Sequence, residues 1–62
     1  MIYVKTCYKN NTIEYNKCET TDLACEIALN NSKNANIEKM QVCIFGFVEY
    51  EFKNGQEVEV TY

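Results

Sequence analysis

Residues 48–60 decide the fold, because they read VEYEFKNGQEVEV, two alternating apolar and polar runs on either side of Asn54-Gly55. Alternation with a period of two is typical of a half-buried β-strand. Asn-Gly between two such runs is a strong hairpin signal. The alternation reaches back to about Lys39, so we expect one long strand over residues 39–53 and a partner strand over residues 56–62. Gly46, near the middle of the long strand, indicates a bend or a bulge.

The loop length of this hairpin depends on which side chains must share a face, because a slip of one residue moves every side chain to the other face. A two-residue loop sets Tyr50 against Glu59 and mixes apolar with charged positions. A three-residue loop over residues 53–55, with Gly55 left-handed in a bulge, pairs Tyr50 with Val58 instead. We therefore predict the three-residue loop. The further pairs in that register are Val48 with Val60 and Tyr62 over Gly46.

The predicted register gives the opposite face of the hairpin four glutamates in facing pairs. The pairs are Glu49 with Glu59 and Glu51 with Glu57. Such a face attracts a basic groove and steers association at low salt. Two other interpretations stay open: a solvated face that keeps a small protein soluble, and a divalent cation site, although no Asp-rich loop accompanies the carboxylates.

An apolar run continues along the same strand face. Cys43, Phe45 and Phe47 would leave apolar surface that a second copy or a partner protein covers. The alternative is a curl of the sheet that buries them internally.

The first part of the chain predicts a hairpin and one helix. Strand formers over residues 1–8 and 13–17 flank a two-residue Asn10-Asn11 loop, which would place Ile13 and Tyr15 on the same face as Val4. Residues 20–22 (TTD) are good N-cap residues for a helix over residues 23–29. The fold class is therefore α+β, a single domain over residues 1–62, with two hairpins in one antiparallel sheet and the helix on one face (ββαββ).

The composition excludes much ordinary chemistry. The chain has no His, Arg, Trp or Pro, and its net charge is −3. Without His, general acid-base catalysis needs a strongly shifted Glu, Lys or Cys. Without Arg and with a negative charge, direct nucleic-acid binding is disfavoured. No apolar stretch is long enough to span a membrane, and the first residues do not resemble a signal peptide, so we expect a cytoplasmic protein.

The four cysteines allow several interpretations. Free thiols that act as small apolar residues fit best; two disulfides or a zinc site are alternatives, with spacings that suit zinc poorly. Cys25, near the predicted helix start, is the one candidate catalytic thiol. The positions are Cys7, Cys18, Cys25 and Cys43.

These observations predict a small non-catalytic protein-binding factor that needs no cofactor or metal. Small size, acidity and Lys-only basic residues suit a phage or mobile-element accessory protein, acting in the host cytoplasm as an inhibitor of a nucleic-acid-handling machine. Its partner would be a protein with a basic surface. The predicted binding residues are Glu49, Glu51, Glu57, Glu59, Phe45 and Phe47. The alternative is a structural subunit that self-associates through the Cys43, Phe45 and Phe47 face.

Overall fold

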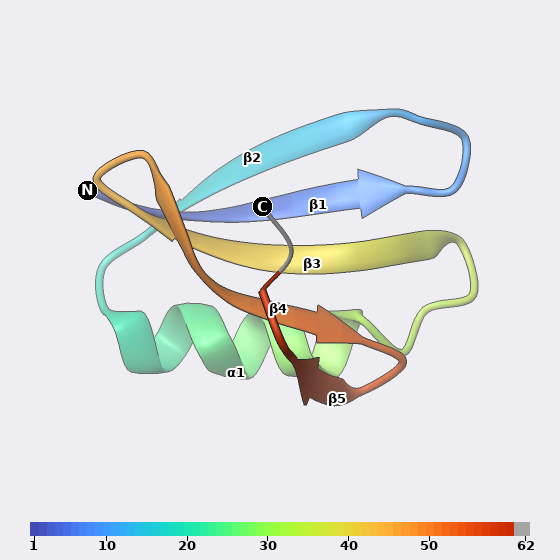
Figure 1. Cartoon of the computed structure of the whole chain (residues 1–62). Helices are drawn as coiled ribbons and strands as arrows, with labels where there is room; N and C mark the ends of the chain where they lie inside the picture. The colour runs from blue at the N-terminus through green and yellow to red at the C-terminus, as the bar shows by residue number, and fades with distance from the viewer. Residues whose placement is uncertain (61–62) are drawn as a thin grey trace.

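The computed structural model describes residues 1–60 and consists of one five-stranded antiparallel sheet with one helix against it (Figure 1). The spatial order of the strands is β2-β1-β3-β4-β5. The elements are β1 (Ile2–Tyr8), β2 (Ile13–Cys18), α1 (Thr21–Asn31), β3 (Ile37–Ile44), β4 (Phe47–Lys53) and β5 (Gln56–Val58). The α+β class and the ββαββ order predicted from the sequence are confirmed, with one additional strand.

The additional strand arises because the long strand expected over residues 39–53 is two strands joined by a turn. Phe45 and Gly46 form that turn between β3 and β4, with φ of 50° and 84°. Positive φ at both central residues is what a two-residue type I′ hairpin requires, and Ile44 pairs with Phe47 across it. The sequence prediction of a bend at Gly46 was right in position, but the bend reverses the chain.

The C-terminal hairpin has a two-residue loop, so the predicted three-residue loop was wrong. Lys53 pairs with Gln56 around Asn54 and Gly55, whose φ values are 53° and 78°. The three-residue loop follows only if the partner strand spans residues 56–62 and keeps its apolar side chains on one face throughout. Strand β5 has only three residues, so little alternation constrains its register. The predicted contact of Tyr62 with Gly46 lies outside the described residues.

The N-terminal hairpin also differs from the prediction by one residue. Cys7 pairs with Ile13, and the Tyr8 N–H donates to the Thr12 carbonyl at 2.9 Å, which leaves a three-residue loop that ends at Asn11 with φ of 72°. This shift of one residue in the pairing places Ile13 and Tyr15 on the face of the sheet away from the helix, where both are exposed. The reason is that β2 lies at the sheet edge, and residues 13–17 are all exposed.

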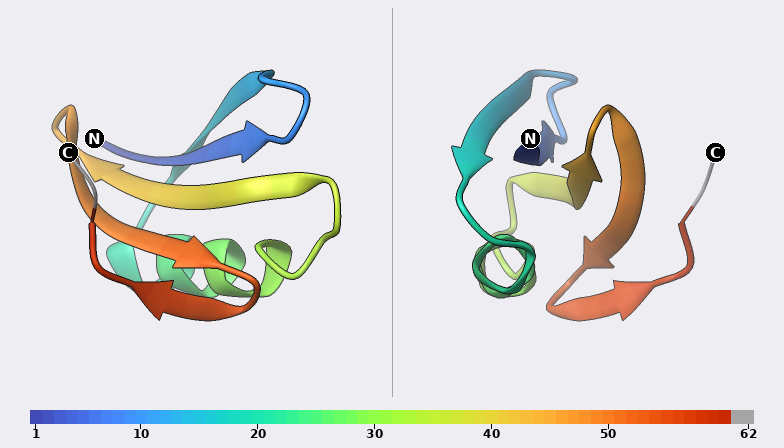
Figure 2. Two further views of the ribbon diagram at one scale, coloured as in Figure 1. Left: turned by 45° about the vertical axis from the view of Figure 1, so that its right-hand side comes forward. Right: turned by 90° about the vertical axis from the view of Figure 1, so that its left-hand side faces the viewer.

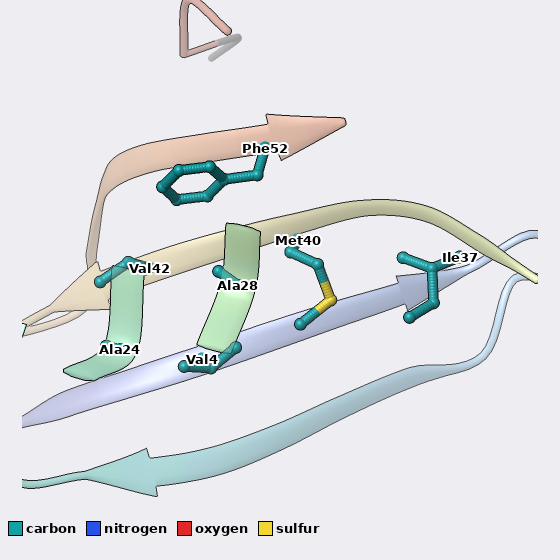
Figure 3. Packing of buried hydrophobic residues seen from close by; sticks show 7 residues of the cluster. All are labelled: Val4, Ala24, Ala28, Ile37, Met40, Val42 and Phe52. Atoms are coloured by element: carbon teal, nitrogen blue, oxygen red, sulfur yellow. The ribbon is translucent and has the colours of Figure 1, made fainter. Parts of the chain in front are cut away.

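The helix packs closely on the sheet through its two alanines. Ala24 and Ala28 have no exposed surface, whereas Leu23 is 46% exposed, so the stripe facing the sheet is the alanine one (Figure 3). The Leu23 N–H donates to the side chain of Thr20 at 3.1 Å, which confirms the predicted N-cap cluster. The remaining core residues are Val4, Ile37, Met40, Val42 and Phe52.

The sheet curls strongly, as the end-on view in Figure 2 shows. As a result the middle of β3 is buried on both faces: Met40 and Val42 face the helix, and Gln41 and Cys43 are buried on the other side. Over residues 1–60, no helix has the length and hydropathy needed to cross a membrane.

Candidate partner-binding surface

The predicted face of four glutamates is not formed. Glu51 is only 1% exposed, and its Oε1 accepts a hydrogen bond from the Gln41 Nε2 at 2.8 Å. Its partner across the hairpin is Val58 and not Glu57. A buried hydrogen-bonded pair of this kind links β3 to β4. Glu51 therefore stabilises the sheet, and its side chain is not accessible to a partner.

The other three glutamates point to different places. Glu57 pairs with Phe52, whose ring lies in the core beside the helix, so Glu57 is on the helix side of the sheet. Glu49 lies in the bulge of β4, where the pairing with β3 shifts by one residue, and Glu59 follows β5. Three exposed carboxylates at separate positions do not make one acidic face, so the facing-pair prediction was wrong; partner contact by each remains a prediction.

The predicted apolar face of β3 is also divided. Cys43 is 8% exposed and lies on the face away from the helix. Phe45 lies in the turn, and Phe47 pairs with Ile44 and so belongs to the helix side. The curl of the sheet buries the cysteine, whereas Phe45 and Phe47 are 78% and 69% exposed.

The two phenylalanines instead belong to one end of the molecule, together with the first residue. The Phe45 N–H donates to the Met1 carbonyl at 2.9 Å, and the Met1 side chain is 60% exposed. Figure 1 shows the β3–β4 turn beside the N-terminus at this end. We call the exposed side chains of Met1, Phe45 and Phe47 the aromatic end. Nothing in the sequence marks Met1 as part of this surface, because only the strand order places it beside the turn.

The backbone of the aromatic end is strained. In a residue with a left-handed backbone conformation, the β-carbon lies too close to the following carbonyl oxygen, which costs about 1–2 kcal/mol of conformational free energy. Glycine, asparagine and aspartate occupy that region most easily, whereas the residue here is Phe45, with φ of 50°. Strain held by a side chain that is mostly in solvent does not help the fold, and such positions are enriched at functional sites.

A shallow hollow of about 440 Å³ lies next to Met1 at the same end. Its wall is partly apolar and partly charged. The lining residues are Met1, Ile2, Lys17, Cys18 and Glu19. A second hollow, of about 620 Å³, lies at the opposite end of β1, beside Tyr8 and Asn36.

The charge of the surface is mainly negative and dispersed. Of the nine acidic residues, only Glu51 is buried; the other eight are exposed. The exposed carboxylates are spread over the helix, the strands β2 to β5 and the segments next to them. A field of this kind steers a basic surface toward the protein as a whole and does not mark one spot.

All four cysteines are free. Burial raises the pKa of the Cys25 thiol, and the carboxylates of Glu57 and Asp22 raise it further. Burial likewise raises the pKa of Cys43, although nearby Lys5 opposes this. Among residues 1–60, no three His, Cys, Asp or Glu side chains converge as metal ligands would.

Comparison with known proteins gives no match: no family model fits the chain, and no curated protein and no solved structure is significantly similar to it.

Proposed function

We propose that the chain is a small non-catalytic protein-binding factor that contacts its partner through the aromatic end. The observation that carries the proposal is Phe45, a large apolar side chain that is 78% exposed on a turn backbone that phenylalanine disfavours. Aromatic side chains that enter a partner's pocket contribute a large share of binding free energy. Because the ring is mostly in solvent, we attribute the presence of phenylalanine at this position to contact outside the chain.

The partner expected from this surface is a protein with an apolar pocket and a basic rim. Phe45 and Phe47 project from one hairpin and would fill the pocket. Glu49 is the acidic residue nearest to them along β4, and the net charge of −3 favours a basic rim. In its finer form, the proposal is that of a phage or mobile-element accessory protein that inhibits a host nucleic-acid-handling machine. Exposed negative charge, and no longer a paired-glutamate face, supports that form.

The absence of catalysis is part of the proposal. The sequence offered Cys25 as a catalytic thiol, and a nucleophilic cysteine needs a lowered pKa. Burial and two nearby carboxylates raise the pKa of Cys25 instead. Less of the reactive thiolate is present at neutral pH than in an unperturbed cysteine, which supports binding over chemistry.

The test is photo-crosslinking followed by affinity measurement. A benzophenone side chain at position 45 is expected to crosslink one protein in cells of the source organism, and the purified partner is then titrated by calorimetry. Phe45→Asn should weaken binding by at least about 30-fold, since anchor side chains contribute 2 kcal/mol or more.

The matched control is Leu23→Gln. Leu23 is 46% exposed but lies on α1, so this variant should bind the partner as the unaltered chain does. Equal affinity of the Phe45→Asn variant and the unaltered chain would refute the proposal. Loss of binding in the Leu23→Gln variant alone would place the contact elsewhere.

A further inference from the structure

The two edges of the sheet differ in how they are protected. Edge strands expose unpaired N–H and C=O groups, and proteins usually shorten them, bulge them, or place proline or charged side chains in them. β5 is shortened to three residues. β2 has six residues, contains no proline and pairs with β1 in an uninterrupted register from Cys18 to Ile13. It carries the charges of Glu14 and Lys17, so the β2 edge is open to a strand whose register sets no like charge opposite them.

The backbone groups that β2 directs outward can be assigned. Tyr8 uses both its N–H and its C=O toward the β1–β2 loop: its N–H donates to Thr12 O at 2.9 Å, and its C=O accepts from Asn11 N–H at 3.0 Å. Hydrogen-bonding direction alternates along an antiparallel strand, so even-numbered residues of β1 bond to β2. Their partners are the even-numbered residues of β2. The residues that direct N–H and C=O outward are Ile13, Tyr15 and Lys17.

The same three residues carry the exposed side chains of the open sheet face. Ile13 is 51% and Tyr15 is 59% exposed. The Tyr15 ring makes an edge-to-face contact with Tyr3 at 6.5 Å, and the Lys5 Nζ lies 5.9 Å from its centre. A strand added at this edge would thus gain backbone bonds and contact with an ordered aromatic side chain.

We propose that the added strand is β2 of a second copy, paired antiparallel about a two-fold axis at Tyr15. In this register Tyr15 faces Tyr15 and Lys17 faces Ile13 of the other copy, so every outward N–H and C=O of the three residues finds a partner. Glu14 faces Asn16 of the other copy, a carboxylate opposite an amide donor. Both helices then lie on the same side of one continuous sheet.

Neighbouring two-fold registers are less favourable. An axis at Glu14 sets two glutamates directly opposite each other, which destabilises a sheet. An axis at Asn16 pairs Ile13 with Glu19, which lies beyond the end of β2. Of these three registers, self-pairing about Tyr15 is the one that sets no like charges opposite each other and also pairs Ile13, Tyr15 and Lys17 within β2. This self-complementarity of the edge is the argument for a second copy.

The proposal is tested by blocking one outward donor without changing a side chain. A chain of 62 residues can be made by chemical synthesis, with a methyl group on the backbone nitrogen of Tyr15. Sedimentation equilibrium of the unmodified chain should show dimers that form with concentration. The methyl group should weaken dimerisation at least about tenfold, because it removes central bonds and blocks approach.

The control carries its methyl group on the backbone nitrogen of Glu57, which points outward at the β5 edge, since Lys53 and Gln56 bond to each other around the turn. This chain should dimerise as the unmodified one does. Circular dichroism checks that all three chains keep their helix. A monomer at every concentration of the unmodified chain, or equal dimerisation with the Tyr15 modification, would overturn the proposal.

Hydrogen exchange supplies a second readout on the unmodified chain. The Tyr15 amide should become protected as the concentration rises, whereas the Asn16 amide, bonded to β1, should be protected at every concentration. Exchange at Tyr15 that is independent of concentration would overturn the inference, and a partner strand from another protein would then be the occupant to seek.

Discussion

Two hairpin turns in this chain, Asn54-Gly55 and Phe45-Gly46, have similar positive φ values but differ in their residue types and in their contacts with the rest of the fold. Asn54 and Gly55 have φ of 53° and 78°; Phe45 and Gly46 have φ of 50° and 84°. The Gly55 N–H donates to the Ser32 Oγ at 2.9 Å, and Ser32 is 1% exposed at the end of the helix. A β-carbon added to Gly46 would meet no atom within 4 Å.

The difference separates a turn that serves the fold from one that does not. Asn-Gly is the favoured pair for a type I′ turn, and here it also attaches the C-terminal hairpin to the helix. The Phe45 turn has a disfavoured residue, an exposed ring and a backbone bond to Met1. We infer that the Asn54-Gly55 turn is optimised for stability, and that the Phe45-Gly46 turn is optimised for contact with a partner.

The largest expected effect is at the glycine of the anchored turn. Gly55→Ala places a β-carbon 2.8 Å from the Lys33 Cγ, at a positive φ. The φ penalty is shared with Gly46→Ala, but only Gly55→Ala also displaces Lys33 and disturbs the bond to Ser32. We expect losses of about 2–3 kcal/mol for Gly55→Ala and about 1–2 kcal/mol for Gly46→Ala in urea unfolding. Equal losses would contradict the distinction.

The next effect is at the attachment itself. Ser32 accepts from Gly55 and donates to the Leu29 carbonyl at 2.8 Å. Ser32→Ala should lower the free energy of unfolding by about 1–2 kcal/mol, because the partly buried Gly55 N–H loses its acceptor. The exposed neighbour Asn31 is the control, and Asn31→Ala should stay within about 0.5 kcal/mol. No greater loss for Ser32→Ala than for Asn31→Ala would show that the hairpin is held by packing alone.

The smallest effect reports on the C-terminal hairpin near the helix. Glu57 on β5 raises the pKa of Cys25, so at pH 8 it lowers the thiolate fraction. Glu57→Gln should lower that pKa and speed alkylation of Cys25 by roughly 1.5- to 2-fold, a small change because the charges are screened by water. Iodoacetamide labelling followed by peptide mass spectrometry measures it, with Glu49→Gln as the control. An unchanged or slower rate for Glu57→Gln would mean that β5 does not lie near the helix.

The sequence predicted the elements well and their registers poorly. The strand patterns over residues 1–8 and 13–17 and the Thr20 N-cap are local signals, and the structure confirms them. The strand expected over residues 39–53 is instead two strands. The predicted registers require each strand to have one buried face and one exposed face. The curled sheet buries β3 on both faces, so polar Gln41 and Glu51 are interior residues that bond to each other. Alternation in the sequence carries no sign of such a pair.

The aromatic end could be predicted only in part. The alternation of Cys43, Phe45 and Phe47 matches a continuous strand, and Phe-Gly is not a turn signal as Asn-Gly is. The turn forms because pairing on both sides of it demands a reversal, which is a property of the whole sheet. Exposure of both phenylalanines was expected as one of two outcomes, but their grouping with Met1 depends on the strand order.

The central claim, that Phe45 is kept at a cost to the fold, can be tested without a partner. Phe45→Asn gives the β3–β4 turn the Asn-Gly pair of the other turn, and the reciprocal Asn54→Phe is its matched control. Equilibrium unfolding in urea should show the Phe45→Asn variant more stable by about 0.5–1 kcal/mol and the Asn54→Phe variant less stable by about 1 kcal/mol. A loss of stability in the Phe45→Asn variant would show that the ring supports the fold, and would contradict the account.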